Sequence, residues 1–189
     1  MLKKAASTTD VTQRKQLYAQ ANNLVKQHVP MLPVAHGGSA TVFKATVAGA
    51  HASPLTDEKF AVMSIPGQDT LVWMQNAEPI GLYCPDETDG ESLRACEQIN
   101  QSLLGYKVGG TDVIPMLAES YEPNADLTEW TFHLRKGVTW HDGTPFTSKD
   151  VVTSFNAWWD AANPLHKGRV GDFTYFSSLF GAFKNAPKK

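Results

Sequence analysis

The chain has 189 residues, and 42% of them are hydrophobic, which is enough for one sizeable core. Its 17 basic and 19 acidic residues give a net charge of −2 without a basic run, so nucleic acid is excluded as a partner. No apolar run approaches the roughly 20 residues that span a bilayer, and the two lysines near the start lack the apolar stretch of a signal peptide. We expect a soluble, mixed α/β fold without a signal peptide.

The first half of the chain predicts one helix followed by strands. Asp10 is an N-cap candidate, the apolar spacing predicts a helix over 12–29, and Pro30 ends it. Two short apolar runs, 31–36 and 40–47, predict strands on either side of a glycine turn. Residues 48–69 carry no period and predict a connection.

The second half mixes helices and strands. A strand is predicted over 70–76, and Asp89 or Ser92 begins a helix whose apolar face runs from Leu93 to Leu104. Alternation over 127–143 predicts a β-hairpin that turns at Lys136-Gly137. Thr147 and Asp150 have the spacing of a capping box before a helix over 151–162, and the tail from Pro164 has a weak pattern.

The two cysteines, Cys84 and Cys96, are too few for a disulfide scaffold and form no Cys-x-x-Cys pair. A zinc site is therefore not expected. One disulfide bond between them fits a chain outside the cytoplasm, and two free buried thiols are the alternative.

Candidate catalytic and metal-binding groups have structural alternatives. His141-Asp142 would serve a small hydrolase, but no nucleophile motif accompanies the pair, and a turn in which Asp142 accepts from backbone amides is favoured. The histidines at 36, 133 and 166 lack ligand spacing, so no metal or other cofactor is expected. Four carboxylates would suit a cation or a solvated helix N-terminus, and we favour the second: Asp86, Glu87, Asp89 and Glu91.

Residues 118–152 form a recognisable series of segments. They read AESYEPNADLTEWTFHLRKGVTWHDGTPFTSKDVV, with Trp130, Phe132 and Leu134 on one face of a strand. Order, spacing and residue type resemble the peptide/nickel-binding class (family 5) of extracytoplasmic solute-binding proteins that serve ABC importers. The preceding block, from LVWMQN to LLGY, is similar to the beginning of the mature proteins of that family.

The first segment of the chain resembles the opposite end of the same family. Asp10, Arg14, Leu17, Tyr18 and Ala21, then the run 29–34 and the exit Val47 to Leu55, are similar to its C-terminal helix, strand and exit. The resemblance implies a permuted order: 1–55 from the C-terminal end, 56–69 as a connector and 70–189 from the N-terminal lobe region, together one domain. The expected architecture is part of one lobe of a two-lobed periplasmic-binding-protein-like clamshell.

The resemblance also implies a function without covalent chemistry, so the chain is not expected to be an enzyme. The lobe would help to capture a peptide or another small solute between two lobes, in the periplasm or at the cell surface, together with the missing lobe and an ABC permease. The ligand-binding candidates, carried over by position, are Tyr83, Thr88, Asp89, Glu91, Leu93, His166 and Arg169. Arg169 would meet a ligand carboxylate with two hydrogen bonds.

An alternative function is a self-associating or partner-docking assembly module derived from that lobe. A lobe without its neighbours exposes apolar surface, and such surface drives association into homo-oligomers or with another chain. The aromatic tail favours this alternative through Phe173, Tyr175, Phe176, Leu179, Phe180 and Phe183.

Overall fold

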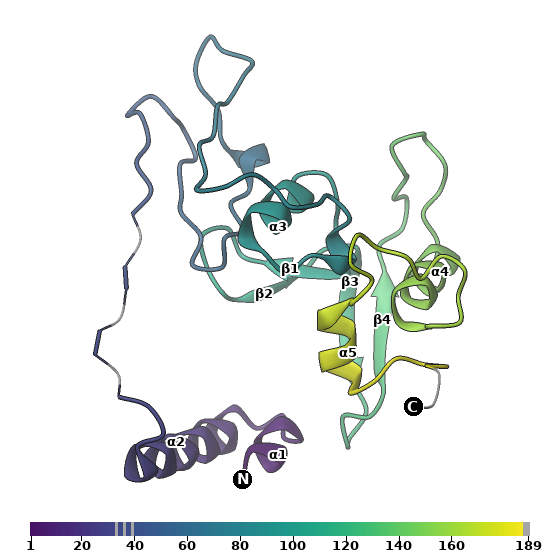
Figure 1. Ribbon diagram of the computed structural model, residues 1–189. Coiled ribbons are helices and arrows are strands. Elements are labelled where there is room, and N and C mark those ends of the chain that lie inside the picture. Colours follow the sequence, from purple (N-terminus) through teal and green to yellow (C-terminus); the bar gives the residue numbers. More distant parts are fainter. Residues whose placement is uncertain (33, 36, 39, 187–189) are drawn as a thin grey trace. The chain divides into compact units, whose positions relative to one another are not determined.

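The structure, a computed structural model, describes residues 1–32, 34–35, 37–38 and 40–186 (Figure 1). The chain divides into two compact units, which are described separately. The first unit comprises residues 1–40 and 119–133, and the second comprises residues 41–118 and 134–189. The predicted segments 1–55, 56–69 and 70–189 were defined by similarity to parts of a family, whereas these two units are defined by their internal contacts. The structure therefore does not test the predicted segments, which stay a prediction.

Two helices open the first unit, α1 (Leu2–Ala6) and α2 (Val11–His28), and they pack against each other. The predicted helix and its N-cap are confirmed, because the side chain of Asp10 accepts a hydrogen bond from the Gln13 amide at 2.8 Å. Its predicted apolar face is nevertheless open to solvent. No residue of α2, all of which is described, is buried, and Leu24 and Val25 are 45% and 50% exposed.

Strands β3 (Ala118–Pro123) and β4 (Trp130–Leu134) pair in a two-stranded sheet joined by the turn 124–129. The predicted hairpin over 127–143 is therefore wrong in its pairing, since β4 pairs with the preceding strand. The residues directly after β4 form an isolated bridge between Thr139 and Pro145 rather than a strand that pairs with β4. Glu122 accepts a hydrogen bond from His133 and raises the pKa of that imidazole.

The second unit begins with irregular chain and short elements: the 3₁₀ turns η1 (Phe60–Val62) and η2 (Cys84–Asp86), and the helix α3 (Gly90–Glu97). The predicted helix at α3 ends early, because Leu104 belongs to the strand β1 (Leu104–Tyr106). Strand β1 pairs antiparallel with β2 (Val113–Pro115), and Gly105 lies opposite Ile114.

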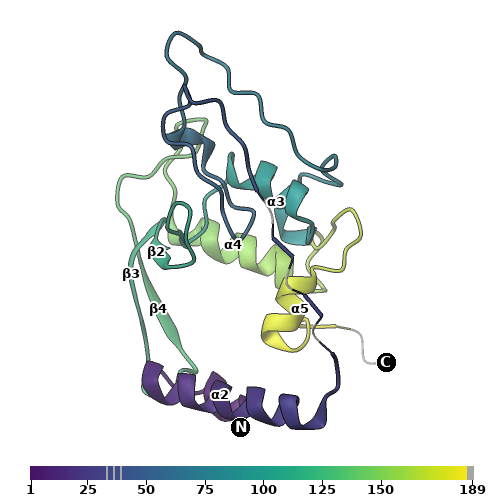
Figure 2. The same cartoon turned by 90° about the vertical axis from the view of Figure 1, so that its left-hand side faces the viewer.

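Helix α4 (Ser148–Trp159) confirms the predicted capping box, since Asp150 accepts from the amide and hydroxyl of Thr147. It packs against α5 (Thr174–Phe180), as Figure 2 shows, through Phe155, Trp158 and Phe176. The helix ends at Trp159, before the predicted limit at residue 162. The Trp159 indole packs on Phe180 in α5.

The strands predicted over 31–36, 40–47 and 70–76 are wrong. The described residues of the first run, and all residues of the other two, belong to no strand, while positions 33 and 36 lie outside the described residues. A strand needs a partner strand for its backbone groups, and the described residues of these runs form no backbone hydrogen bond other than the local turn from the Val47 amide to the Lys44 carbonyl.

Few large side chains are buried. Among the described residues Phe173 is the only aromatic residue in the core, and the other buried hydrophobic residues are Ala5, Met63, Cys96, Ala118 and Ala157. The described chain therefore buries less apolar area than its composition allows.

Candidate ligand-binding site

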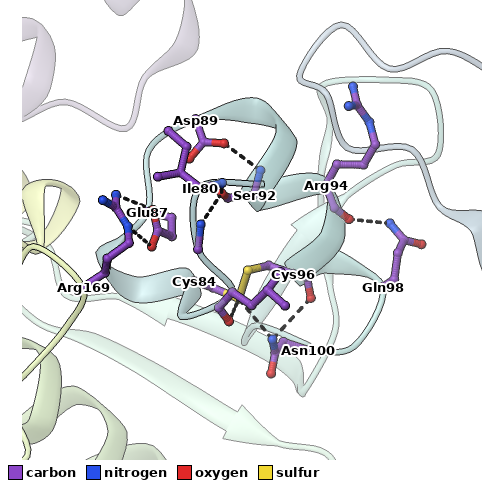
Figure 3. The surroundings of a disulfide bond; sticks show 12 residues. Ile80, Cys84, Glu87, Asp89, Ser92, Arg94, Cys96, Gln98, Asn100 and Arg169 are labelled. Atoms are coloured by element: carbon purple, nitrogen blue, oxygen red, sulfur yellow. Dashed lines mark hydrogen bonds and ion pairs between the residues drawn. A yellow bond between two sulfur atoms is a disulfide. The ribbon is translucent and has the colours of Figure 1, made fainter. Parts of the chain in front are cut away.

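The segment 80–93 contains most of the predicted ligand-binding residues. Hydrogen bonds at the start of helix α3 hold this segment in place. Asp89 caps the helix by accepting from the Ser92 amide at 2.8 Å. Ser92 is fully buried, and its hydroxyl accepts from the amides of Ile80 and Gly81 at 2.9 and 3.2 Å. The chain before η2 is thus held against the start of α3 (Figure 3).

A disulfide bond joins Cys84 in η2 to Cys96 in α3, with the two Cα atoms 5.8 Å apart. The sequence left this bridge and two free thiols as alternatives, and the structure has the bridge. Asn100 donates to the Cys84 sulfur at 3.1 Å and to the Cys96 carbonyl at 3.3 Å (Figure 3). The loop with the candidate residues is therefore closed covalently at its base.

Asp86 connects this loop to a segment more than eighty positions away. Its carboxylate is 5% exposed and accepts from the amides of Val170, Gly171 and Phe173 at 2.8, 2.9 and 3.0 Å. Burial acts to raise the pKa of Asp86, but the converging amides outweigh it and hold the pKa below its ordinary value. The amides form a concave anion site that the chain fills with its own carboxylate.

Glu87 makes a second connection beside the first. Its buried carboxylate accepts two hydrogen bonds from Arg169, at 3.0 Å to Nε and 2.9 Å to Nη2 (Figure 3). Glycines allow the approach: a Cβ at Gly81 would lie 2.8 Å from Glu87 Cδ, and one at Gly168 would lie 2.8 Å from Asp86 Cβ. Two neighbouring carboxylates thus hold one loop against the other.

Aromatic side chains complete the cluster. The Tyr83 ring meets Phe173 edge to face at 6.1 Å, and its hydroxyl accepts from the Trp158 indole at 3.1 Å. His166 stacks on the Phe173 ring, with ring centroids 4.4 Å apart, and its Nδ1 lies 2.9 Å from the Ala157 carbonyl oxygen. The buried Phe173 ring therefore joins both candidate segments.

The structure brings the two predicted groups of site residues together in one cluster. Tyr83 and His166 both contact Phe173. Burial acts to raise the pKa of Asp89, but the hydrogen bonds from Ser92 and the positive charge of Arg169 outweigh it and hold the pKa below its ordinary value. Thr88 is exposed, while Glu91 and Leu93 are half-buried on α3. A role for these residues in ligand binding stays a prediction. The carboxylate that Arg169 meets here belongs to Glu87 of the chain itself.

Two residues assigned to a solvated helix N-terminus are placed differently. Asp86 and Glu87 are buried, whereas the prediction grouped them with Asp89 and Glu91 at the surface. Their partners are 82 to 87 positions distant in sequence, and no local pattern marks such a pairing. The sequence predicts Ser92 only as a possible cap, and no local signal marks its buried hydroxyl.

The other candidate groups have structural roles. Asp142 accepts from the amide and hydroxyl of Thr144 at 2.9 and 2.7 Å, which confirms the predicted turn and lowers the pKa of Asp142. In the part of the chain that the structure describes, no three His, Cys, Asp or Glu side chains gather as a metal centre requires. His36 lies outside the described residues.

A groove of about 390 Å³ lies elsewhere in the second unit, between residues 73–78 and α3. Trp73 and Phe60 form its aromatic wall, with ring centroids 4.9 Å apart. Arg94 lies 5.6 Å from the Trp73 ring and donates to Glu58 at 2.7 Å and Gln75 at 2.9 Å.

Comparisons with known proteins find the same family that the sequence resembles. Residues 112–173 match the family model described as "Bacterial extracellular solute-binding proteins, family 5 Middle". This match ends at Phe173, inside the cluster described above.

Three relatives show the range of similarity. The dipeptide-binding protein of Escherichia coli (strain K12) is 38% identical over 117 residues, 58% of this chain and 22% of that protein. Heme-binding protein A of Haemophilus influenzae is 36% identical over 118 residues, 59% of this chain and 22% of that protein. The nickel-binding periplasmic protein of Escherichia coli is 30% identical over 111 residues, 53% of this chain and 20% of that protein.

The chain thus spans about a fifth of the length of the curated relatives it matches. The similarity is to substrate-binding proteins rather than to enzymes. Within the residues described, no helix combines the length and the apolar character that crossing a membrane demands.

Proposed function

We propose that this chain is part of one lobe of a family 5 solute-binding protein and supplies one wall of a ligand site. The observation that carries the proposal is the overlap of two features. The segment matched by the family model ends in the loop 166–173, and Asp86 and Glu87 hold that loop against the predicted ligand-binding residues. Preorganised walls of this kind favour reversible capture without covalent chemistry.

The ligand class we propose is peptide-like, since the relatives include dipeptide-binding proteins. Capture would need a second lobe, because closure of two lobes around a ligand buries it and one lobe leaves it half in water. In the parent protein the partners would be that lobe and an ABC permease, outside the cytoplasm. The order of segments, with the C-terminal part first, belongs to the same proposal.

The experiment that tests this is a titration of the ¹⁵N-labelled chain with alanylalanine, followed by amide chemical shifts. We expect weak binding, at millimolar peptide, that shifts the amide signals of Thr88, Asp89 and Glu91. Hemin and Ni²⁺ serve as parallel probes, since relatives bind heme and nickel. Shifts confined to other parts of the chain, or no shift with any probe, would contradict the proposal.

A matched pair of variants separates binding from folding. Asp89→Asn retains a good N-cap but removes the charge, so we expect weaker binding with α3 preserved. Asp142→Asn removes a carboxylate from an exposed turn far from the candidate residues in sequence and should leave the titration unchanged.

The alternative, an assembly module, has one observation in its favour: large apolar side chains remain exposed. In the tail, Tyr175, Leu179 and Phe180 are 54%, 76% and 44% exposed. The predicted aromatic patch is smaller than expected, however, because Phe173 is fully buried and Phe176 packs against α4.

A further inference from the structure

The disulfide bond closes a ring that contains both carboxylates bound to the loop 166–173. Cys84 is the first residue of η2, Asp86 is the last, and Glu87 follows directly. The Glu87 amide donates to the Cys84 carbonyl oxygen at 3.2 Å, which ties the backbone of this residue to Cys84. On the other side of the ring, Cys96 lies in the last turn of α3 (Figure 3). The positions of the two carboxylates therefore depend on where the bond holds Cys84.

Two connections in different directions hold η2. The disulfide bond joins it to α3, and the Asp86 carboxylate joins it to the amides of Val170, Gly171 and Phe173. A 3₁₀ turn of three residues is not stable by itself, so η2 relies on such connections. Each connection fixes the turn in the place that the other one needs. The coupling between the two is therefore reciprocal, and loss of one weakens the other.

The two sulfur atoms belong to residues that differ in access. Cys84 is half-buried, whereas Cys96 is 3% exposed, so a thiolate from solvent attacks the Cys84 sulfur. A new S–S bond forms to the reductant, the Cys84–Cys96 bond breaks, and Cys96 leaves with the electron pair and takes up a proton. The second thiol of a dithiol reductant then displaces Cys84 as a thiolate, to which the Asn100 side-chain amide, 3.1 Å from the sulfur, donates before it is protonated. The dithiol is oxidised to a disulfide, and the chain gains two thiols.

We propose that the Cys84–Cys96 bond is a redox-sensitive switch for the contact between η2 and the loop 166–173. With the bond intact, Asp86 and Glu87 bind that loop. With the bond reduced, the ring opens and the two carboxylates separate from their partners in the loop, and re-oxidation restores the contact. Any effect on ligand capture rests on the proposed function, whereas the switch itself requires no ligand.

Hydrogen exchange of the natural chain under native conditions, with and without dithiothreitol, tests the switch. We expect exchange at the amides of Val170, Gly171 and Phe173 to accelerate by about tenfold or more on reduction, and to slow again on re-oxidation. The hydrogen-bonded amides of Lys107 and Met116 belong to the same unit and serve as internal controls. Their exchange rates should not change.

The reciprocity of the coupling provides a second test. Weakening the contact with the loop should make the disulfide bond easier to reduce. Asp86→Asn keeps the shape of the side chain but leaves one acceptor oxygen for three amides, so the equilibrium constant for reduction by dithiothreitol should rise by about tenfold. Asp142→Asn, in an exposed turn outside the ring, is the matched control and should leave this equilibrium constant unchanged.

Equal exchange rates of the three loop amides in the oxidised and the reduced chain would overturn the proposal. So would an acceleration that Lys107 and Met116 share, because the bond would then support the whole unit rather than one contact. An equilibrium constant that Asp86→Asn leaves unchanged would overturn it as well. Where circular dichroism shows that Asp86→Asn loses helix, Glu87→Gln takes its place, since it retains one acceptor for Arg169. None of these measurements uses a ligand, so failure of the switch and failure of the proposed function are distinguishable.

Discussion

Replacing Asp86 with alanine is expected to destabilise the second unit by on the order of 3 kcal/mol. The substitution leaves the amides of Val170, Gly171 and Phe173 without their shared acceptor in a buried site. The midpoint of urea unfolding should fall, and hydrogen exchange at these three amides should accelerate. Because Phe173 is the buried aromatic residue of this unit, its near-ultraviolet environment should change as well.

The Asp86 carboxylate also predicts a pH dependence. Its pKa is lowered in the folded chain, so its contribution is complete above the pKa of a free aspartate and is lost as the pH falls through the folded value. Asp86→Ala should therefore flatten the acid limb of the stability profile.

A matched control tests whether the effect belongs to the cluster. Asp142→Ala removes a fully exposed carboxylate that accepts only from Thr144, and its effect on stability should be much smaller. Equal effects of the two substitutions would show that the converging amides do not stabilise the unit through Asp86.

Removing the disulfide bond is the second large effect that we expect. Replacing both Cys84 and Cys96 with serine opens the loop 84–96, and a loop of this length contributes about 3 kcal/mol through the entropy of the unfolded chain. The loop contains Glu87, Asp89 and Ser92, so exchange at the Ile80 and Gly81 amides should also accelerate.

Reduction of the natural chain provides the matched comparison for these substitutions. Reduction should lower the urea midpoint of the natural chain, as the two serine substitutions do. It should not change the urea midpoint of the double serine variant. A stability that is the same with and without the disulfide bond would contradict a role for it in ordering the loop.

Local signals predicted the helices α2, α3 and α4, but not the short helices α1 and α5. Asp10 caps α2 and Thr147 with Asp150 caps α4, because each capping residue and its hydrogen-bond partner lie three positions apart. The turn at Asp142 was predicted for the same reason. These bonds form within one segment and depend on no other part of the chain.

Tertiary pairing was predicted poorly, for a physical reason. The alternation at 130–134 identified a strand, but not that its partner is the preceding segment, and 70–76 has strand composition but no partner strand among the described residues. Likewise, the buried roles of Asp86 and Glu87 depend on residues 166–173, which sequence spacing does not relate to them. The resemblance pointed to two segments that the structure brings into contact, but not to the contacts that join them.

We propose that this chain supplies one wall of a ligand site that needs another lobe, and isothermal titration calorimetry of the folded, oxidised chain with alanylalanine can test this. We expect no saturable heat at micromolar concentrations, because one lobe cannot bury the peptide. Micromolar binding with one peptide per chain would contradict it and would mean that the chain holds a complete site by itself.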